Sequence, residues 1–199
     1  AVRMRLIRKA VWKAAGACKD ITAAHLQAVA DLLEKQTGRY VKLPYGLTAT
    51  RVYNVIEIMG KRKETEKICL PIDTDRLPEN LLAGEWKFSF KKFLYDGNTD
   101  KIPRKMYTKW FDYDKIKDSL AIRNRRKGDY FVLDAAGHHK KLEDYFVNEK
   151  IPASHRDEQL LLAGEDEIFW IVGGRMAYGT GISDATRWVL EITASNSSH

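Results

Sequence analysis

The chain has 199 residues, of which 44% are hydrophobic and 31% are charged, a composition typical of a globular protein with a buried core. No apolar run approaches the roughly 20 residues that a membrane-spanning helix needs, and two cysteines, Cys18 and Cys69, are too few for a disulfide framework. The net charge of +7 is compatible with nucleic acid as a partner, and we expect a cytoplasmic protein that binds no membrane.

The first 117 residues are expected to form a helix pair followed by an antiparallel sheet. Residues 3–17 and 23–36 place apolar side chains at helical spacing, and Gly38 ends the second helix. The pattern then changes to the alternation typical of strands, with a hairpin from residues 40–43 and 47–58 around a turn at Gly46. Alternation also predicts strands at residues 67–72, 86–90 and 107–113.

A modest change in composition at residues 114–119 suggests a boundary, so we expect domains at 1–117 and 118–199. The second is predicted to be a small mixed α/β domain of short strands with one main helix, at residues 140–148. Its strands are expected at residues 120–123, 130–133, 160–162, 168–172 and 187–192, followed by a polar tail at 193–199. The predicted fold class of the whole chain is therefore α+β.

Positive charge is distributed unevenly along the chain. Residues 1–117 contain 24 Lys and Arg against 14 Asp and Glu, whereas residues 118–199 contain 10 against 13. Six of those ten cations lie between positions 123 and 141: Arg123, Arg125, Arg126, Lys127, Lys140 and Lys141. A basic patch on an otherwise acidic domain is a candidate surface for nucleic-acid phosphates.

Residues 123–129, which we name the basic turn, are suited to holding an anion. Gly128 can supply a backbone conformation that other residues avoid, and Asp129 can cap the turn or pair with one of the arginines. Lys140 and Lys141 begin the predicted helix, whose N-terminal N–H groups also favour anions. We therefore expect a composite phosphate site, and a solvated, internally paired surface is the alternative interpretation of the same charges.

Three other motifs are not assigned a binding or catalytic function. The glycines at 173–174, 179 and 181 follow a strand, but no helical pattern comes after them, so they are expected to be turn residues and not a nucleotide loop. The histidines and cysteines lack the spacing of a metal site. Ser154, His155 and Asp157 are sequence neighbours and cannot converge as a catalytic triad.

Around the basic turn the chain resembles tRNA(Ile)-lysidine synthase, over the two C-terminal domains of that family only. The distal match follows the order Arg123-x-Arg125-Arg126-x-Gly128-Asp129-x-Phe131, then Lys140-Lys141-Leu142 and Lys150-Ile151-Pro152. It continues through Arg156 and Leu161-Leu162 to Ile168-Phe-Trp-Ile-Val-Gly173-x-Arg175. In the first domain, Val41-x-Leu43-Pro44-x-Gly46-Leu47 and Arg51-x-Tyr53 are similar to the middle domain of the family.

The resemblance implies a function. In this family a catalytic domain uses ATP to adenylate the wobble cytidine of an isoleucine tRNA and then attaches lysine, and its Ser-Gly-Gly-x-Asp-Ser loop is absent from this sequence. The chain would be a non-catalytic, tRNA-binding part without a cofactor of its own, ATP and Mg²⁺ would belong to the catalytic domain, and the parent enzyme could be a homodimer. A free-standing nucleic-acid-binding module is the alternative. The expected tRNA-binding residues are Arg123, Arg125, Arg126, Lys127, Lys140 and Lys141, with Arg156 and Arg175 as secondary candidates.

Overall fold

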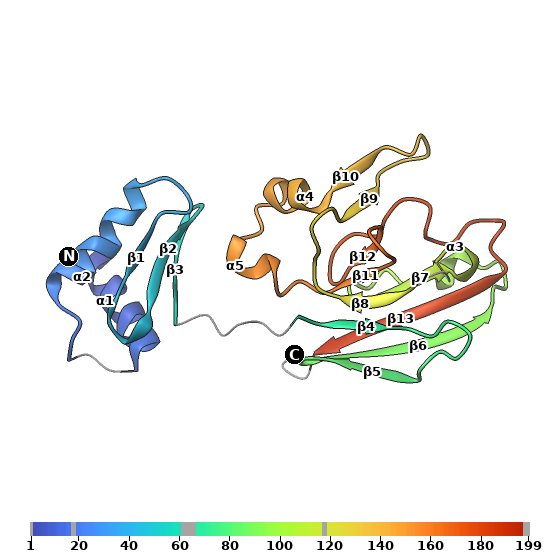
Figure 1. Cartoon of the computed structure of the whole chain (residues 1–199), viewed down its shortest axis with the longest axis horizontal. Helices are drawn as coiled ribbons and strands as arrows, with labels where there is room; N and C mark the ends of the chain where they lie inside the picture. Colours follow the sequence, from blue (N-terminus) through green and yellow to red (C-terminus); the bar gives the residue numbers. More distant parts are fainter. Residues whose placement is uncertain (1, 17–18, 61–66, 117–118, 197–199) are drawn as a thin grey trace. The chain divides into compact units, whose positions relative to one another are not determined.

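The computed structural model describes residues 2–16, 19–60, 67–116 and 119–196. The chain divides into two compact units, which we name unit 1 (Ala1–Thr65) and unit 2 (Glu66–His199) (Figure 1). Both units combine helices with antiparallel strands, so the predicted α+β fold class is confirmed. Within the described ranges, no helix is long and apolar enough to cross a bilayer.

Unit 1 consists of a helix pair and a three-stranded antiparallel sheet. The helices are α1 (Val2–Ala15) and α2 (Ala23–Asp31), and a 3-10 turn at Leu32–Glu34 follows α2. The strands, in spatial order, are β1 (Tyr40–Lys42), β2 (Thr48–Val52) and β3 (Val55–Met59), with a 3-10 turn at Pro44–Gly46 between the first two. Figure 1 shows both helices on one side of the sheet. The core between them contains Val11, Leu26, Val29, Leu32, Leu43, Leu47 and Ala49.

Unit 2 is built around two four-stranded antiparallel sheets. The first has the order β5-β6-β13-β7, formed by β5 (Asn80–Ala83), β6 (Trp86–Leu94), β13 (Trp188–Asn196) and β7 (Thr108–Asp112). The second has the order β12-β11-β8-β4, formed by β12 (Ile168–Ile171), β11 (Leu161–Ala163), β8 (Ala121–Arg123) and β4 (Cys69–Pro71). Phe88, Phe111 and Leu190 of the first sheet share a buried core with Ile122 and Trp170 of the second. The two sheets therefore pack face to face.

A hairpin and a helix cover the other face of the second sheet (Figure 1). The hairpin is formed by β9 (Tyr130–Val132) and β10 (His139–Lys141), and α4 (Leu142–Asn148) follows it directly. Phe131, Leu142 and Phe146 pack with Leu161 and Ile168 in a separate core. The remaining short segments are a 3-10 turn (Thr99–Lys101), α3 (Tyr113–Ile116) and α5 (Ala153–Arg156).

The division between the units falls after residue 65, whereas the sequence analysis expected it after residue 117. β13 pairs with both β6 and β7, and β4 pairs with β8, so strands from both sides of residue 117 share the two sheets. Alternating apolar side chains identify a strand but not its partner, and these partners are far apart in the sequence. The expected boundary therefore cuts through the middle of unit 2.

Three element boundaries also differ from the predictions. Residues 47–58 form two strands and not one, because a turn at Tyr53, which has a φ of 47°, reverses the chain between β2 and β3. The helix expected from Lys140 begins at Leu142, because Lys140 and Lys141 pair with β9 as part of β10. Residues 193–196 of the expected polar tail continue β13 along β6, and residues 197–199 lie outside the described residues.

Candidate nucleic-acid interface

A buried ion pair holds the base of the basic turn. Arg123 at the end of β8 is 0% exposed, and Asp129 is 2% exposed. Arg123 donates to both carboxylate oxygens of Asp129, from Nη1 at 2.9 Å and from Nη2 at 2.8 Å, and Nη2 also donates to the Glu165 carbonyl at 2.9 Å. Because its side chain points into the protein, Arg123 cannot reach a phosphate. This burial corrects the expectation that Arg123 contacts RNA.

Asp129 also fixes the backbone of the turn. Its Oδ2 accepts the backbone N–H of Arg126 at 2.7 Å, so the carboxylate both caps the turn and pairs with an arginine. Gly128 has a φ of 98°, a conformation that side chains strongly disfavour. The predictions for Asp129 and Gly128 are thus confirmed. With the backbone held in this way, the side chains of Arg125, Arg126 and Lys127 are left at the protein surface.

The turn is tied to the segment before β4. The Asn124 N–H donates to the Ile68 carbonyl at 3.0 Å, and the Ile68 N–H donates to Asn124 Oδ1 at 2.7 Å. These two bonds bring the exposed Lys67 next to the basic turn. Lys67 was not among the predicted site residues, because its place depends on the β4–β8 pairing, which joins residues 50 or more positions apart.

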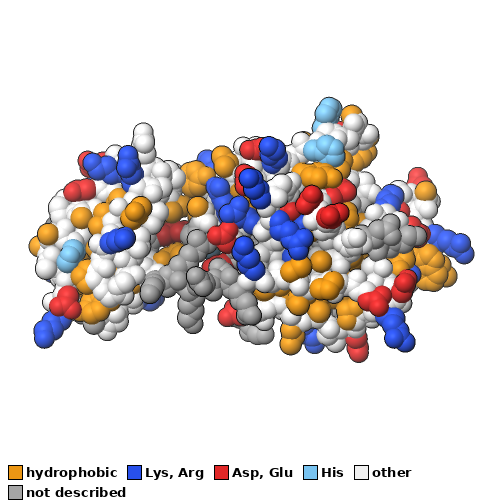
Figure 2. Space-filling view, in the orientation of Figure 1, with side chains coloured by type: hydrophobic (Ala, Val, Ile, Leu, Met, Phe, Trp, Pro, Cys, Tyr) orange, Lys and Arg blue, Asp and Glu red, His pale blue; other side chains and the backbone are white. Residues whose placement is uncertain are grey.

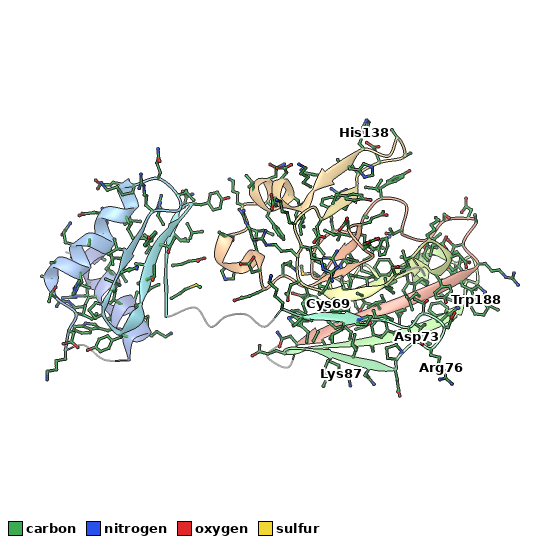
Figure 3. The ribbon with its side chains drawn as sticks, viewed as in Figure 1. Cys69, Asp73, Arg76, Lys87, His138 and Trp188 are labelled. Atoms are coloured by element: carbon green, nitrogen blue, oxygen red, sulfur yellow. The ribbon has the colours of Figure 1, made fainter. Side chains whose placement is uncertain are left out.

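A groove of about 580 Å³ opens at this junction. Its charged lining consists of four cations and two carboxylates: Lys67, Arg125, Arg126, Lys127, Glu143 and Asp157. Figure 2 shows Lys and Arg side chains gathered on this part of unit 2, and Figure 3 marks Cys69, which also lines the groove. The groove therefore has an excess of positive charge, and four separate stretches of unit 2 form its lining.

The two carboxylates of the groove contact Arg125. Arg125 Nε and Nη2 both lie 2.7 Å from Asp157 Oδ1, and Nη1 lies 3.8 Å from Glu143 Oε1. Arg126 Nη2 donates to Cys69 Sγ at 3.0 Å, and the side chains of Arg126 and Lys127 are exposed. Two N–H groups of Arg125 thus share a single carboxylate oxygen of Asp157, and they are the kind of groups that also bind phosphate oxygens.

The other predicted site residues lie on neighbouring surfaces of unit 2 and do not line this groove. Lys140 and Lys141 sit on β10, opposite Phe131 and Tyr130. The Arg156 guanidinium lies 6.0 Å from the ring centroid of Phe146, and its Nε donates to the Ile151 carbonyl. The exposed Arg175 guanidinium lies 5.1 Å from the ring centroid of Phe131. Lys140 and Lys141 are therefore carried by the strand β10, and Lys141 is also the N-cap residue of α4, which begins two residues later than the predicted helix start.

The tip of the β9–β10 hairpin has its own local side-chain hydrogen bond. His138 Nδ1 lies 2.8 Å from Asp134 Oδ2, and this hydrogen bond lowers the pKa of the Asp134 carboxyl below its ordinary value. The carboxylate also accepts the backbone N–H groups of Ala136 and His138. These contacts define the shape of the loop before Lys140.

The glycines after β12 are turn residues, as predicted. Gly173 and Gly179 have φ values of 76° and 81°, and no helix lies between β12 and β13 in the described chain. A phosphate loop of the predicted kind places its N–H groups at the start of a helix, an arrangement that this segment lacks. Among the described residues, no group of three or more His, Cys, Asp or Glu side chains could hold a metal ion.

Three comparisons show which known proteins this chain resembles. Residues 120–192 match the family described as the TilS substrate C-terminal domain. The tRNA(Ile)-lysidine synthase of Caldanaerobacter subterraneus subsp. tengcongensis is 32% identical over 193 residues, which cover 96% of this chain and 41% of that protein. The tRNA(Ile)-lysidine synthase of Clostridium perfringens is 29% identical over 201 residues, which cover 97% of this chain and 43% of that protein. A crystal structure of a TilS C-terminal domain aligns with 66% of this chain and 98% of its own, at 19% identity and a TM-score of 0.49.

The segment of residues 120–192, which contains the basic turn, is thus similar to a TilS-type substrate C-terminal domain. Over 96% of its length the chain is homologous to tRNA(Ile)-lysidine synthases, the family that its sequence motifs resemble. It spans about two fifths of the length of the curated relatives that it matches.

Proposed function

We propose that the groove of unit 2 binds tRNA, so that this chain acts as the tRNA-binding part of a tRNA(Ile)-lysidine synthase. The observation that carries the proposal is the convergence of Lys67, Arg125, Arg126 and Lys127 on one groove. RNA helices are recognised mainly through their shape, phosphates and 2′-hydroxyls, so clustered cations on a fixed backbone suit this ligand. Similarity over 96% of the chain to a protein named tRNA(Ile)-lysidine synthase favours this proposal over a free-standing nucleic-acid-binding module.

Binding would make Arg125 exchange its partners. In the free protein its guanidinium is held by Asp157, whose side chain is 41% exposed, so a phosphate can approach the same N–H groups. The exposed Arg126 and Lys127 would provide the long-range attraction, since their charges face solvent. Lys140, Lys141, Arg156 and Arg175 remain proposed contacts for neighbouring phosphates.

The wider properties of the enzyme are part of the same proposal. The tRNA would be an isoleucine tRNA with a wobble cytidine, and ATP and Mg²⁺ would be held by residues other than these 199. We propose that this chain contributes tRNA binding, not catalysis, in a cytoplasmic enzyme that could act as a homodimer. Formation of lysidine by this chain alone, supplied with ATP, lysine and tRNA, would contradict the non-catalytic assignment.

The groove is tested by charge reversal. The variant Arg126→Glu with Lys127→Glu should lower the affinity for isoleucine tRNA by about tenfold or more and should reduce the slope of log Kd against log salt by about 1 to 2, because two phosphate contacts are lost. Affinity is measured by fluorescence anisotropy over a series of KCl concentrations. Both side chains are exposed, so the fold is expected to survive, which circular dichroism checks.

A matched variant controls for net charge. Arg76→Glu with Lys87→Glu makes the same change in charge on exposed residues that do not line the groove (Figure 3). It should leave the affinity close to that of the unaltered chain. Equal losses in the two variants would mean that overall charge, and not the groove, attracts the tRNA.

A further inference from the structure

We propose that Asp157 and Glu143 make the groove selective for RNA by accepting hydrogen bonds from ribose 2′-hydroxyl groups. In the free protein both carboxylates face the Arg125 guanidinium. When a phosphate takes their place on Arg125, they bind the 2′-hydroxyls beside it. The inference rests on the proposed function, because it assigns the selection of RNA over DNA to two residues of the same groove.

The two carboxylates weaken the attraction of the groove for a polyanion. Four cations line the groove together with Glu143 and Asp157, so the acids cancel half of its positive charge. Each carboxylate repels a nearby phosphate, and the affinity of a protein for a nucleic acid rises with the number of phosphates that its cations neutralise. Attraction alone thus does not account for two acids in this place.

The contact between Asp157 and Arg125 adds little to the stability of the fold. Their side chains are 41% and 31% exposed, so water screens the attraction between the two charges. The basic turn is held without this contact, because Asp129 accepts a backbone N–H of the turn and two hydrogen bonds join Asn124 to Ile68. Stability therefore does not account for the two acids either.

Asp157 covers an edge of the Arg125 guanidinium that an oxyanion can use. Arg125 Nε and Nη2 both lie 2.7 Å from Asp157 Oδ1, and Nη1 lies 3.8 Å from Glu143 Oε1. Two neighbouring N–H groups of a guanidinium can bind two oxygens of one phosphate. A phosphate that binds there displaces Asp157, and the displaced carboxylate then needs a new hydrogen-bond donor.

An RNA chain supplies this donor beside the phosphate. The 2′-hydroxyl lies on the ribose that carries the 3′-phosphate, so each phosphate that links two nucleotides has a hydroxyl next to it. RNA helices display these hydroxyls in their wide, shallow minor groove. A hydroxyl that donates to a carboxylate forms a charge-assisted hydrogen bond, which is stronger than a bond between neutral groups. Both Arg125 and Asp157 therefore regain a partner in a complex with RNA.

DNA lacks the 2′-hydroxyl, which makes the exchange of partners unequal. A DNA phosphate can displace Asp157 from Arg125, but the carboxylate is then left beside negative charge without a new donor. Arg126 and Lys127 have exposed side chains and attract the phosphates of either nucleic acid. The cations thus supply affinity, whereas the carboxylates set the difference between two affinities, which is the measure of specificity.

Fluorinated tRNA tests the inference, because a 2′-fluoro ribose keeps the A-form of an RNA helix but cannot donate a hydrogen bond. The unaltered chain should bind isoleucine tRNA about tenfold more tightly than the same tRNA with fluorine in place of every 2′-hydroxyl. Glu143→Ala with Asp157→Ala should reduce that ratio by about fivefold or more. The same variant should bind the fluorinated tRNA about threefold more tightly, because the repulsion is removed. Fluorescence anisotropy gives all of these dissociation constants.

Two further variants serve as controls. Asp144→Ala with Glu158→Ala removes the same charge from exposed acids that directly follow Glu143 and Asp157 in the sequence and do not line the groove. It should leave the ratio unchanged. Asp157→Asn keeps an oxygen that accepts hydrogen bonds, so it should retain part of the preference that Asp157→Ala loses. Thermal unfolding checks that each variant remains folded.

The outcomes separate this inference from the proposed function. A ratio near one in the unaltered chain, or an unchanged ratio in the variant of Glu143 and Asp157, would overturn the role of the carboxylates. An equal loss of affinity for both forms of the tRNA would also overturn it, because the carboxylates would then only position Arg125. If the charge-reversed variant of Arg126 and Lys127 loses tRNA affinity in these cases, the groove stands without the inference. If that variant keeps full affinity, both are wrong.

Discussion

At the scale of single residues, the basic turn depends on one arginine that never reaches the surface. Arg123 and Asp129 form a bidentate pair in the interior, and Arg123 Nε has no hydrogen-bond partner in the described chain. A buried pair of this kind adds little net stability, because desolvation offsets the attraction between the charges. Its effect is to fix the geometry of the turn, since the same carboxylate also binds the Arg126 N–H.

This role leads to a prediction for Asp129. Asp129→Ala should lower the free energy of unfolding by about 3 to 5 kcal/mol, because it leaves the Arg123 charge buried without a partner. Arg123→Met combined with Asp129→Leu should cost less than that single change, because no buried charge remains. Urea unfolding measures both. A double variant that is less stable than Asp129→Ala would show that the pair itself supplies the stability.

The sequence predicted some of these residues and not others. Gly128 and Asp129 could be predicted because their roles are local to the turn and belong to their residue types. The burial of Arg123 could not, because it follows from the place of β8 between β11 and β4. Lys67 could not be assigned to the site for the same reason.

At the scale of elements, the turn after β12 is shaped by close contact with Tyr107. A Cβ atom added to Gly173, which has a φ of 76°, would lie 2.7 Å from Tyr107 Cε1. Gly179 has a similar φ of 81°, but no atom lies within 4 Å of the Cβ position there. Both glycines therefore have a positive φ, but only Gly173 has a neighbouring side chain close to where a Cβ atom would lie.

Alanine at the two positions separates these effects. Gly179→Ala should destabilise the protein by about 1 to 2 kcal/mol, the cost of a left-handed conformation for a residue with a Cβ. Gly173→Ala should cost about 1 to 3 kcal/mol more, because Tyr107 must also move. Thermal unfolding gives both values. Equal costs would show that Tyr107 adjusts freely.

Elements were predictable where their pattern is local. The apolar spacing of α1 and α2, and the hairpin of β11 and β12, appear in the structure close to where they were expected. The start of α4 was not predictable, because the pattern of residues 140–148 does not reveal that the first two residues pair with β9. The turn at Tyr53 was missed because a non-glycine residue adopts a positive φ there.

At the scale of the whole molecule, unit 2 depends on pairings between distant parts of the chain. β13 is a central strand of its sheet, with β6 on one side and β7 on the other. The face-to-face core of unit 2 takes residues from before and after position 117, so the expected second domain, 118–199, holds only part of it. The family model matches residues 120–192, which lie within unit 2. The ends of this match are not the ends of the folded unit, which begins at Glu66.

This organisation predicts how fragments of unit 2 will fold. A fragment of residues 118–199 lacks β4, β5, β6, β7 and α3. Seven of the 17 buried residues in the face-to-face core of the described chain lie before residue 118 and are lost with these elements and the segments between them. At about 1.5 to 3 kcal/mol for each large apolar side chain, that loss matches or exceeds the whole stability of about 5 to 15 kcal/mol that a domain has. The fragment 118–199 should therefore show poorly dispersed amide NMR signals and no cooperative unfolding, whereas a fragment of residues 67–199 should show both dispersion and a cooperative transition. A well-folded 118–199 fragment would mean that β13 and β8 find adequate partners without the first half of the unit.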